Sequence, residues 1–402
     1  MALLHLLSWT LLLAALWAMG LPLAAALFPR FPDRGAALAL PVALTVVGLV
    51  AYWVGHLRYG WVAPVAGVAV LAALAAVALR RGYAVPPRLA RGAVAVFALA
   101  FVAMLAVRAV DAAIVPRGGE KFLDFALLRS VLRADALPPE DPWFAGRALR
   151  YYYGGPMLAA ALTRLSATPP GVAYNLALAT FFATIASAAY GVAGAVAALS
   201  PRRVPRRLAG AVGAFLVVAG GNLATPARLL VGHLLSPAAA VRHAEPLFAG
   251  IRMDPADAVA AYGPGQGYTA WLARYVVPGT PDVFPAWTYL NGDLRAHMLS
   301  PPFLLLVAAC GVAYAGCPAT DRRRRLLVFG AVPLAGGMAT LVSTWALPTV
   351  AGLTWLALLL GDPDPAALLP GRVAALPVEG RLRREVGRAL VAAALAAAAG
   401  GL

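Results

Sequence analysis

Residues 61–79 read WVAPVAGVAVLAALAAVAL, a run of nineteen residues without a charged side chain. A helix that crosses the hydrocarbon core of a bilayer needs about 20 predominantly apolar residues. The rest of the chain has the same character, because 62% of its 402 residues are hydrophobic and only 12% are charged. Soluble domains average about 45–50% apolar and about 25% charged residues. The sequence therefore predicts an all-α protein of the membrane and excludes an ordinary soluble domain.

Ten segments meet or nearly meet the length of a membrane-spanning helix. They are 3–28, 36–55, 61–79, 92–112, 172–199, 208–222, 298–317, 326–345, 347–361 and a last one from 388. We expect a polytopic transmembrane helical bundle of about ten spans in the lipid bilayer. The first 28 residues lack the basic start and the small-residue cleavage site of a signal peptide, so we expect a retained span. The last segment is still apolar where the sequence stops, and we expect a fragment or a shortened paralogue.

Residues 151–165, YYYGGPMLAAALTRL, decide the topology, because they are apolar but short. Short cytoplasmic loops collect Lys and Arg. If this stretch does not cross, four arginine clusters fall on one side of the membrane. The clusters are Arg80, Arg81, Arg88 and Arg91; Arg202, Arg203, Arg206 and Arg207; Arg322 to Arg325; and Arg381, Arg383, Arg384 and Arg388. We therefore interpret 151–165 as a juxtamembrane or re-entrant helix on the outer face of a cell membrane.

This topology divides the chain into spans and two large outer loops. The divisions are N-terminal spans at 1–112, a first outer loop with juxtamembrane helices at 113–171, spans at 172–222, a second outer loop at 223–297, and C-terminal spans at 298–402. Eleven of the 17 acidic residues then lie outward. They are Asp111, Glu120, Asp124, Asp135, Glu140, Asp141, Glu245, Asp254, Asp257, Asp282 and Asp293.

The chain is strongly basic, with 33 Lys and Arg against 17 Asp and Glu. Basic groups that interrupt apolar runs orient helices in a bilayer more often than they bind nucleic acid, so we expect no nucleic-acid partner. Cys310 and Cys317 lie seven residues apart within one apolar stretch. That spacing is typical of a helix core and of neither a metal box nor a disulfide framework.

Residues 120–134 show apolar side chains at near-helical spacing, which predicts an amphipathic helix lying on the membrane surface. Glu120 and Asp124 are four residues apart and share one face of that helix. Two neighbouring carboxylates repel unless a proton, a metal ion or a basic group accompanies them. The alternative is a solvated first turn, where acidic residues favour the helix N-terminus.

Two further features of the first outer loop indicate a site. Prolines stiffen PPEDPWFAG (138–146) around Glu140 and Asp141, although Asp before Pro is also ordinary turn chemistry. Tyr151, Tyr152 and Tyr153 follow. A membrane-interface belt explains at most two of three consecutive tyrosines, because they point in different directions on a helix. The third is a candidate to line a sugar or lipid pocket.

The second outer loop ends in DVFPAWTYLNGDLRAHML (282–299). Asp293 and His297 are four residues apart, which allows either a metal pair or a histidine that is simply hydrogen-bonded. Arg295 beside an acid could hold a phosphate or form a salt bridge. The glycine-rich YGPGQGY (262–268) lacks the lysine of a phosphate loop, and we assign it no nucleotide role.

Several runs together resemble a known family. They are LFPRFPDRG (27–35), EKFLDF (120–125), PPEDPWFAG, RYYYGG (150–155), PPGVAYNLALA (169–179) and FPAWTYLNGDLRAHM (284–298). The chain is similar to the archaeal and chloroflexi membrane proteins named for a triple tyrosine, the Chlor_Arch_YYY or DUF2298 family. That family in turn resembles the multi-span GT-C glycosyltransferases, which use a polyprenyl-phosphate sugar donor and carry essential acids in the first large outer loop.

The resemblance implies a GT-C-like glycosyltransferase acting on a lipid-linked sugar. Asp124 or Glu120 would be the base or a metal-binding acid, and Asp141 a second acid. A divalent metal ion or an arginine would neutralise the departing phosphate. Candidate phosphate contacts are Arg129, Arg133 and Arg295.

The chain departs from the family pattern at two positions, Val283 and Arg295, where Glu and His are expected. Two non-catalytic alternatives stand beside the enzyme. One is a transporter or lipid-handling protein, which the scarcity of ionisable residues inside the spans disfavours. The other is a degraded paralogue that scaffolds a complex.

Overall fold

The chain is built from helices wherever the structure describes it. The computed structural model describes residues 2–115, 120–201, 204–220, 285–318, 321 and 323–361, and short parts of 384–398. Within these ranges the only extended pairing is an isolated antiparallel bridge between Glu140 and Ala148. The all-α class predicted from composition is confirmed.

Seven helical segments are long and apolar enough to cross a bilayer. They are α1 (Ala2–Leu27), η1 with α2 (Ala36–Leu38 and Ala39–Gly55), α3 (Val62–Arg80), α4 (Pro87–Val110), α7 (Pro170–Leu199), α14 with α15 (Ala296–Leu299 and Pro301–Ala315), and α16 with η3 and α17 (Arg323–Leu326, Leu327–Ala331 and Val332–Val342). All seven coincide with expected spans.

The three remaining expected spans differ from these seven. The segment expected at 208–222 is α8 (Arg206–Phe215) followed by a π-helical turn, η2 (Leu216–Gly220), which ends with the described part of the chain. The segment expected at 347–361 is α18 (Ala346–Leu360), an apolar helix shorter than a full span. Most of the segment from 388 lies outside the described residues.

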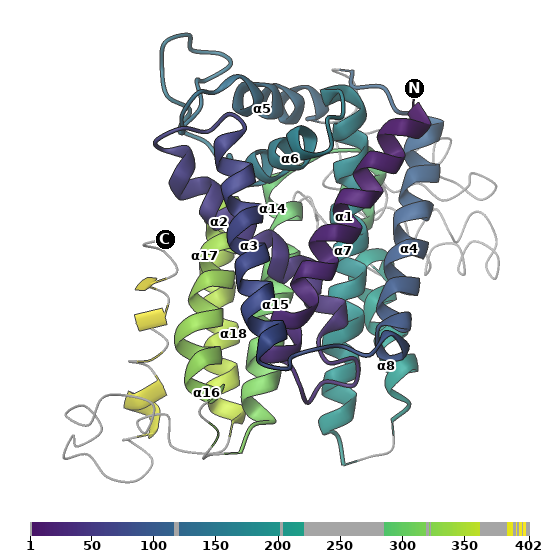
Figure 1. Ribbon diagram of the computed structural model, residues 1–402, viewed down its shortest axis with the longest axis vertical. Helices are drawn as coiled ribbons and strands as arrows, with labels where there is room; N and C mark the ends of the chain where they lie inside the picture. The colour runs from purple at the N-terminus through teal and green to yellow at the C-terminus, as the bar shows by residue number, and fades with distance from the viewer. Residues whose placement is uncertain are drawn as a thin grey trace, which may run out of the picture.

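Two helices lie across one end of the bundle instead of traversing it, namely α5 (Lys121–Arg133) and α6 (Gly154–Leu165) (Figure 1). The twelve residues of α6 cover about 18 Å at 1.5 Å per residue, which is too short for the hydrocarbon core. The interpretation of 151–165 as a non-crossing helix therefore agrees with the observed arrangement. The apolar spacing at 120–134 likewise predicted α5.

Two glycines explain how α6 seats on the bundle. A Cβ atom added to Gly154 would lie 2.4 Å from the Leu341 carbonyl oxygen in α17, and one added to Gly155 would lie 2.5 Å from the Leu299 side chain in α14. Small residues allow helices to approach this closely. The two glycines of the YYYGG run therefore seat the start of α6 against α14 and α17.

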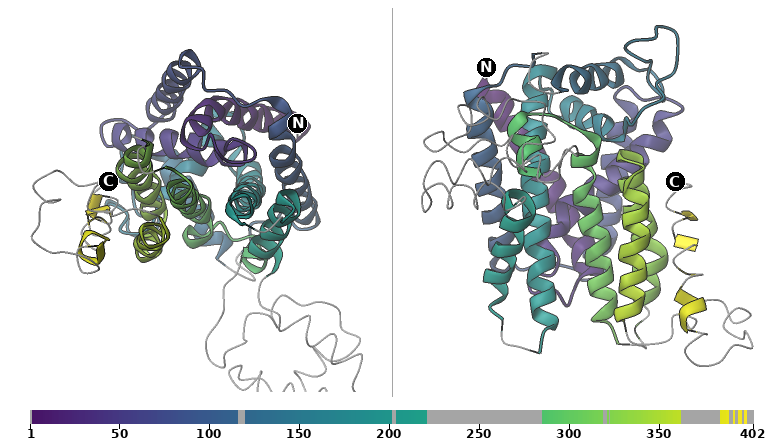
Figure 2. Two further views of the ribbon diagram at one scale, coloured as in Figure 1. Left: turned by 90° about the horizontal axis from the view of Figure 1, so that it is seen from below. Right: turned by 180° about the vertical axis from the view of Figure 1, so that it is seen from behind.

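The arginine-rich connections gather at the end opposite α5 and α6. The end of α3 and the start of α4, the end of α7 and the start of α8, and the end of α15 and the start of α16 all lie there (Figures 1 and 2). Arg388 also reaches this end, because its Nε donates to the Leu358 carbonyl oxygen in the last turn of α18 at 3.3 Å. Within the described residues the arginine clusters thus share one end, as the sequence predicts. Arg202, Arg203, Arg322, Arg381 and Arg383 lie outside the described residues.

The core lies around α7, which packs against α4, α8 and α15. Polar atoms inside this apolar core are satisfied locally. Thr180 donates to the Leu176 carbonyl oxygen one turn earlier, and it accepts a hydrogen bond of 2.9 Å from the Trp9 indole of α1. The bundle therefore supplies a rigid base for the polar groups at the α5 end.

Candidate functional site

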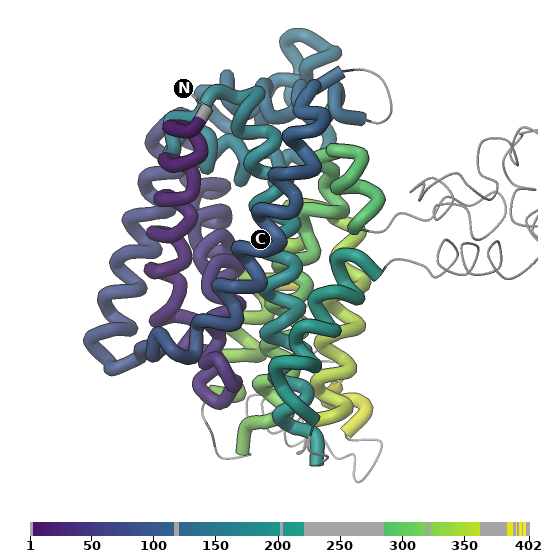
Figure 3. The backbone as a smooth tube through the Cα atoms, turned by 90° about the vertical axis from the view of Figure 1, so that its right-hand side faces the viewer, coloured from purple at the N-terminus to yellow at the C-terminus, as the bar shows by residue number. Residues whose placement is uncertain are grey.

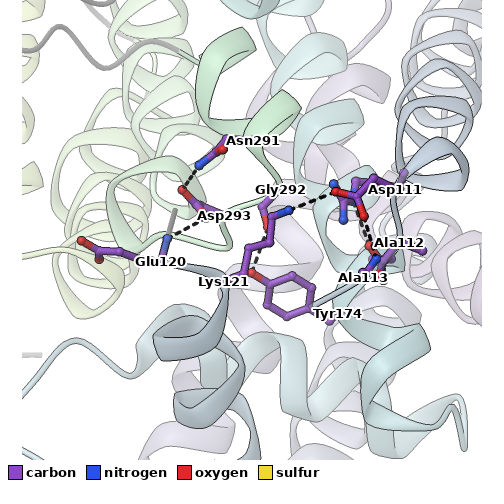
Figure 4. A network of polar contacts seen from close by, with 11 residues as sticks. Asp111, Ala112, Ala113, Glu120, Lys121, Tyr174, Asn291, Gly292 and Asp293 are labelled. Atoms are coloured by element: carbon purple, nitrogen blue, oxygen red, sulfur yellow. Dashed lines mark hydrogen bonds and ion pairs between the residues drawn. The ribbon is translucent and has the colours of Figure 1, made fainter. Parts of the chain in front are cut away.

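Two stretches far apart in sequence meet at the α5 end of the bundle. The first is the start of α5, and the second is the turn between α13 (Pro285–Asn291) and α14. The Glu120 backbone N–H donates to Asp293 Oδ1 at 3.0 Å, across 173 residues (Figure 4). Asp293 is therefore the acceptor for an N–H group at the N-terminus of α5.

Asp124 is the chemically most unusual residue of this region. Its side chain faces inward from α5 and is 5% exposed, and its Oδ2 atom has no hydrogen-bond partner among the described residues. Burial raises the pKa of Asp124 to about 8, and the charges of Asp293 and Glu120 add to the rise. The charge of Arg295 and a hydrogen bond from the Leu294 backbone N–H oppose it.

Asp293 is completely buried. Burial raises its pKa, while a hydrogen bond of 2.6 Å from Asn291 Nδ2, the charge of Arg295 and the Glu120 N–H oppose the rise. Buried carboxylates are costly unless they are paired and hydrogen-bonded, and Asp293 is both. We infer that Asp293 organises the site, because its oxygens hold the ends of two separate segments.

Arg295 links the acids. Its Nη2 lies 2.6 Å from Glu120 Oε1, and its Nε lies 4.0 Å from Asp293 Oδ2. Of the two roles that the sequence left open for Arg295, the salt bridge is the one present. Arg295 therefore places a fixed positive charge beside Glu120 and Asp293, and this charge also acts on Asp124.

His297 lies one residue inside α14, and its Nε2 atom is buried without a hydrogen bond among the described residues. Because α14 begins at Ala296, Asp293 precedes the helix and the two residues do not share a helical face. The metal pair of Asp293 and His297 stays a prediction. No group of three or more His, Cys, Asp or Glu side chains with metal-binding geometry occurs in the part of the chain that is described.

The three consecutive tyrosines have three different environments. Tyr151 lies near the acids. Burial is the main cause that raises its pKa, and the charges of Glu120 and Asp124 raise it further. The Tyr152 hydroxyl accepts a hydrogen bond of 3.3 Å from Thr344, which follows α17. Tyr153 stacks on Tyr52 of α2 with ring centroids 6.4 Å apart. Only Tyr151 belongs to the neighbourhood of Asp124.

The PPEDPWFAG loop is organised around its own backbone. Asp141 Oδ1 accepts the backbone N–H groups of Trp143 and Phe144 at 2.8 and 3.2 Å, and Glu140 Oε1 accepts that of Gly146 at 2.6 Å. These contacts match the turn chemistry that the sequence offered as the alternative. Asp141 is not among the charges that shift the pKa of Asp124.

Arg129 and Arg133 are exposed on α5. At 100° per residue they are turned away from Asp124 by roughly 140° and 180°. The structure therefore does not bring them together with the acids. In the second outer loop, Glu245, Asp254, Asp257, Asp282, Val283 and YGPGQGY (262–268) lie outside the described residues.

Arg108 and its neighbours are members of the site that the sequence did not single out. Arg108 is 3% exposed in the last turn of α4, its Nε donates to Asn175 Oδ1 at 2.8 Å, and its Nη2 has no hydrogen-bond partner among the described residues. Its guanidinium lies against the backbone of Gly292, where an added Cβ would be 2.5 Å from Nη1. The site therefore has a second cation.

Tyr174 and Lys121 complete the network (Figure 4). The Tyr174 hydroxyl donates to the Gly292 carbonyl oxygen at 2.9 Å and accepts the Leu294 N–H at 3.3 Å. Lys121 is buried and pairs with Asp111 at 3.4 Å. Tyr174 lies in the PPGVAYNLALA run that carries the family resemblance, so the sequence offered a signal for it. No sequence pattern linked Arg108 to the NGDLR residues (291–295).

Residues 46–401 match the model of a protein family described as uncharacterized membrane protein (DUF2298). The chain belongs to this family. The match covers both halves of the site, the start of α5 and the turn between α13 and α14. No curated protein and no solved structure matches the chain. The DUF2298 membership agrees with the resemblance carried by the triple tyrosine and the acidic motifs.

Proposed function

We propose that this chain is a GT-C-like glycosyltransferase that takes a sugar from a polyprenyl-phosphate donor at the outer face of the cell membrane. One observation carries the proposal, namely the buried Asp124 carboxyl, which keeps one oxygen free beside Asp293 and Arg295. Strongly perturbed carboxyl groups with specific charged neighbours cluster at catalytic sites. The site lies at the end of the bundle where α5 and α6 rest on the spans (Figure 1).

In the proposed reaction, an oxygen of the acceptor forms a bond to the anomeric carbon of the sugar. The bond between that carbon and the phosphate oxygen of the donor breaks, and the phosphate leaves with the electron pair. The acceptor proton passes to Asp124. A general base works best when its pKa lies near the working pH, and a pKa of about 8 meets this condition.

We assign the neutralisation of the leaving phosphate to Arg295 and Arg108. Arg295 is held by Glu120 at 2.6 Å, a contact that a phosphate oxygen could replace. Arg108 offers a buried Nη2 without a hydrogen-bond partner in the described part of the chain. Fixed positive charges act strongly on charge that develops in a desolvated site. A divalent metal ion is the alternative neutralising charge, and inhibition by a chelator would favour it.

Tyr151 is the tyrosine that we assign to the substrate. It is 48% exposed and lies close enough to Glu120 and Asp124 for their charges to raise its pKa. An exposed aromatic ring beside a polar site can stack on a sugar while its hydroxyl stays hydrated. The Tyr152 hydroxyl instead bonds to Thr344, which follows α17, and the Tyr153 ring stacks on Tyr52 of α2. These contacts fit a structural role.

The test is a transfer assay with the purified chain in nanodiscs, a panel of polyprenyl-phosphate hexoses and membrane-extract acceptors. We expect release of polyprenyl phosphate by the unmodified chain and loss of at least a hundredfold in Asp124→Asn, the order expected for a general base. Asp135→Asn is the matched control, because Asp135 is exposed and follows the same helix. It should retain the activity of the unmodified chain.

The outcomes separate the candidate functions. Equal turnover by Asp124→Asn and Asp135→Asn would remove Asp124 as the base. Saturable donor binding without turnover by the unmodified chain would instead favour the lipid-handling alternative.

A further inference from the structure

A polar cavity lies at the arginine-rich end, far from Asp124. Its empty space is about 500 Å³, a figure that includes open solvent at its mouth. Arg88 in the first turn of α4 and Arg206 and Arg207 in the first turn of α8 line it from two sides. Figure 3 shows α4 in dark blue and α8 in teal on the same side of the bundle.

The floor of the cavity is formed by α7, where one glycine leaves room for a ligand. Gly191 and Gly194 both line the space. A Cβ atom added to Gly194 would meet only the Arg206 carbonyl oxygen, at 3.4 Å. Gly191 instead allows α7 to approach η1, because an added Cβ atom would lie 2.6 Å from the Ala37 Cβ atom. The absence of a side chain at Gly194 therefore keeps this part of the cavity open.

The cavity is positively charged. None of the three arginines has an ion pair or hydrogen bond within the described residues. The one acidic group among the lining residues is Asp33, whose two oxygens accept the backbone N–H groups of Gly35 and Ala37 at 2.9 Å each. Both Asp33 oxygens thus bind backbone N–H groups at the start of η1. The guanidinium groups of Arg88, Arg206 and Arg207 are therefore available to bind a ligand.

Two helices also begin at this cavity. The first turns of α4 and α8 follow Pro86 and Pro205, and neither has a side-chain cap. The free N–H groups of a helix N-terminus favour anions, and the helix dipole adds to the attraction. In α4, however, Pro87 has no N–H group and the Leu89 N–H donates to the Pro86 carbonyl oxygen at 2.9 Å, so the start of α8 contributes more of this attraction. The arginines and the start of α8 therefore select the same class of ligand, a phosphate group.

The surface beside the cavity is apolar. On α8, Leu208 and Phe215 are 60% and 62% exposed, and on α4, Leu99 and Val102 are 74% and 61% exposed. In a bilayer these side chains face acyl chains. A ligand that joins a phosphate to acyl chains therefore matches both the charged cavity and the apolar faces, whereas a free anion matches only the cavity.

We propose that this cavity binds the phosphate head group of an anionic phospholipid, with Arg88, Arg206 and Arg207 as its ligands and the acyl chains lying along α4 and α8. Basic pockets between transmembrane helices on the cytoplasmic side bind anionic head groups in this way. The site is separate from the acidic cluster and does not depend on the proposed sugar transfer.

The experiment compares lipid binding by two charge-matched variants. Native mass spectrometry of the purified chain, titrated with phosphatidylglycerol in a phosphatidylcholine background, would count bound anionic lipids and give their Kd. One variant carries Arg88→Gln, Arg206→Gln and Arg207→Gln. The control carries Arg80→Gln, Arg81→Gln and Arg91→Gln, which remove the same charge at the same end but do not line the cavity.

We expect the unmodified chain and the control to retain one tightly bound phosphatidylglycerol, and the cavity variant to bind it on the order of a hundredfold more weakly. Gly194→Leu should weaken binding without a change in charge, because its side chain would occupy the cavity. If the triple variant does not fold, Gly194→Leu alone tests whether the cavity binds the lipid.

Three outcomes would overturn the proposal. Equal losses in the cavity variant and the control would mean diffuse attraction to a basic end. Unchanged binding by Gly194→Leu would place the lipid elsewhere. Saturable binding of inorganic phosphate in pure phosphatidylcholine, with no preference for phosphatidylglycerol, would identify a site for a soluble anion instead.

Discussion

At the scale of the residue, Asp124 combines burial with a lack of hydrogen-bond partners for one oxygen. The spacing of Glu120 and Asp124 predicted two carboxylates on one face of a helix, but Glu120 is the residue before α5 and pairs with Arg295, whereas Asp124 is buried in the first turn of α5. It could not predict which acid is buried, because that depends on the Asn291–Arg295 turn that packs against α5. For the same reason the sequence could not decide whether Arg295 holds a phosphate or forms a salt bridge.

The raised pKa of Asp124 has a consequence for stability. In the unfolded chain an aspartate titrates near pH 3.9, whereas Asp124 in the folded protein titrates near pH 8. Between these values the folded state holds a proton that the unfolded state has released, so the free energy of unfolding falls as the pH rises. Asn at this position does not titrate.

We therefore expect Asp124→Asn to raise the Tm in detergent more at pH 8 than at pH 5. Thermal unfolding followed by tryptophan fluorescence at both pH values measures the difference. Asp135→Asn, at an exposed acid that follows the same helix, is the control for the loss of one carboxylate. A gain in Tm that is the same at both pH values would contradict the raised pKa.

At the scale of the element, helices were predictable and the turn between them was not. Apolar periodicity predicted α5 and the spans, since that signal is local. The turn between α13 and α14 depends on Gly292, whose φ of +81° lies in the left-handed region, and on the Arg108 guanidinium packed against it. Such a contact joins α4 to a segment more than 180 residues away, and no local pattern encodes it.

Gly292→Ala tests this contact, with Gly146→Ala as its control. Both glycines have a positive φ, which costs an alanine roughly 1–2 kcal/mol, but only Gly292 has a neighbour that an added Cβ would strike. We expect Gly292→Ala to lower the Tm clearly more than Gly146→Ala. Equal losses would mean that Arg108 moves aside without cost.

At the scale of the whole molecule, the arginine clusters predicted the arrangement better than hydropathy did. Hydropathy alone gave about ten spans, whereas seven segments in the described part of the chain have full length. The arginines predicted that α6 does not cross, because one additional crossing would have separated the clusters, and the twelve-residue length of α6 agrees with this prediction. The charge pattern constrains the sides of all loops together, whereas a hydropathy window evaluates one helix at a time.

Cysteine labelling checks the proposed orientation. Ala145→Cys lies in the loop after α5, and Arg81→Cys lies in the link between α3 and α4. We expect a membrane-impermeant maleimide to label Ala145→Cys in intact cells and to label Arg81→Cys only after lysis. The native Cys310 and Cys317 are buried, so the unmodified chain gives the background. Labelling of both positions in intact cells would refute the topology.

The central claim is that two distant stretches form one proton-accepting site, and the pH dependence of kcat/KM tests it most directly. For the unmodified chain the rate should rise with pH as Asp124 loses its proton, with a midpoint near 8. Asp293→Asn removes a charge that raises this pKa and should move the midpoint to lower pH, and Arg295→Gln removes a charge that lowers it and should move the midpoint to higher pH. A midpoint that neither substitution moves would contradict the account.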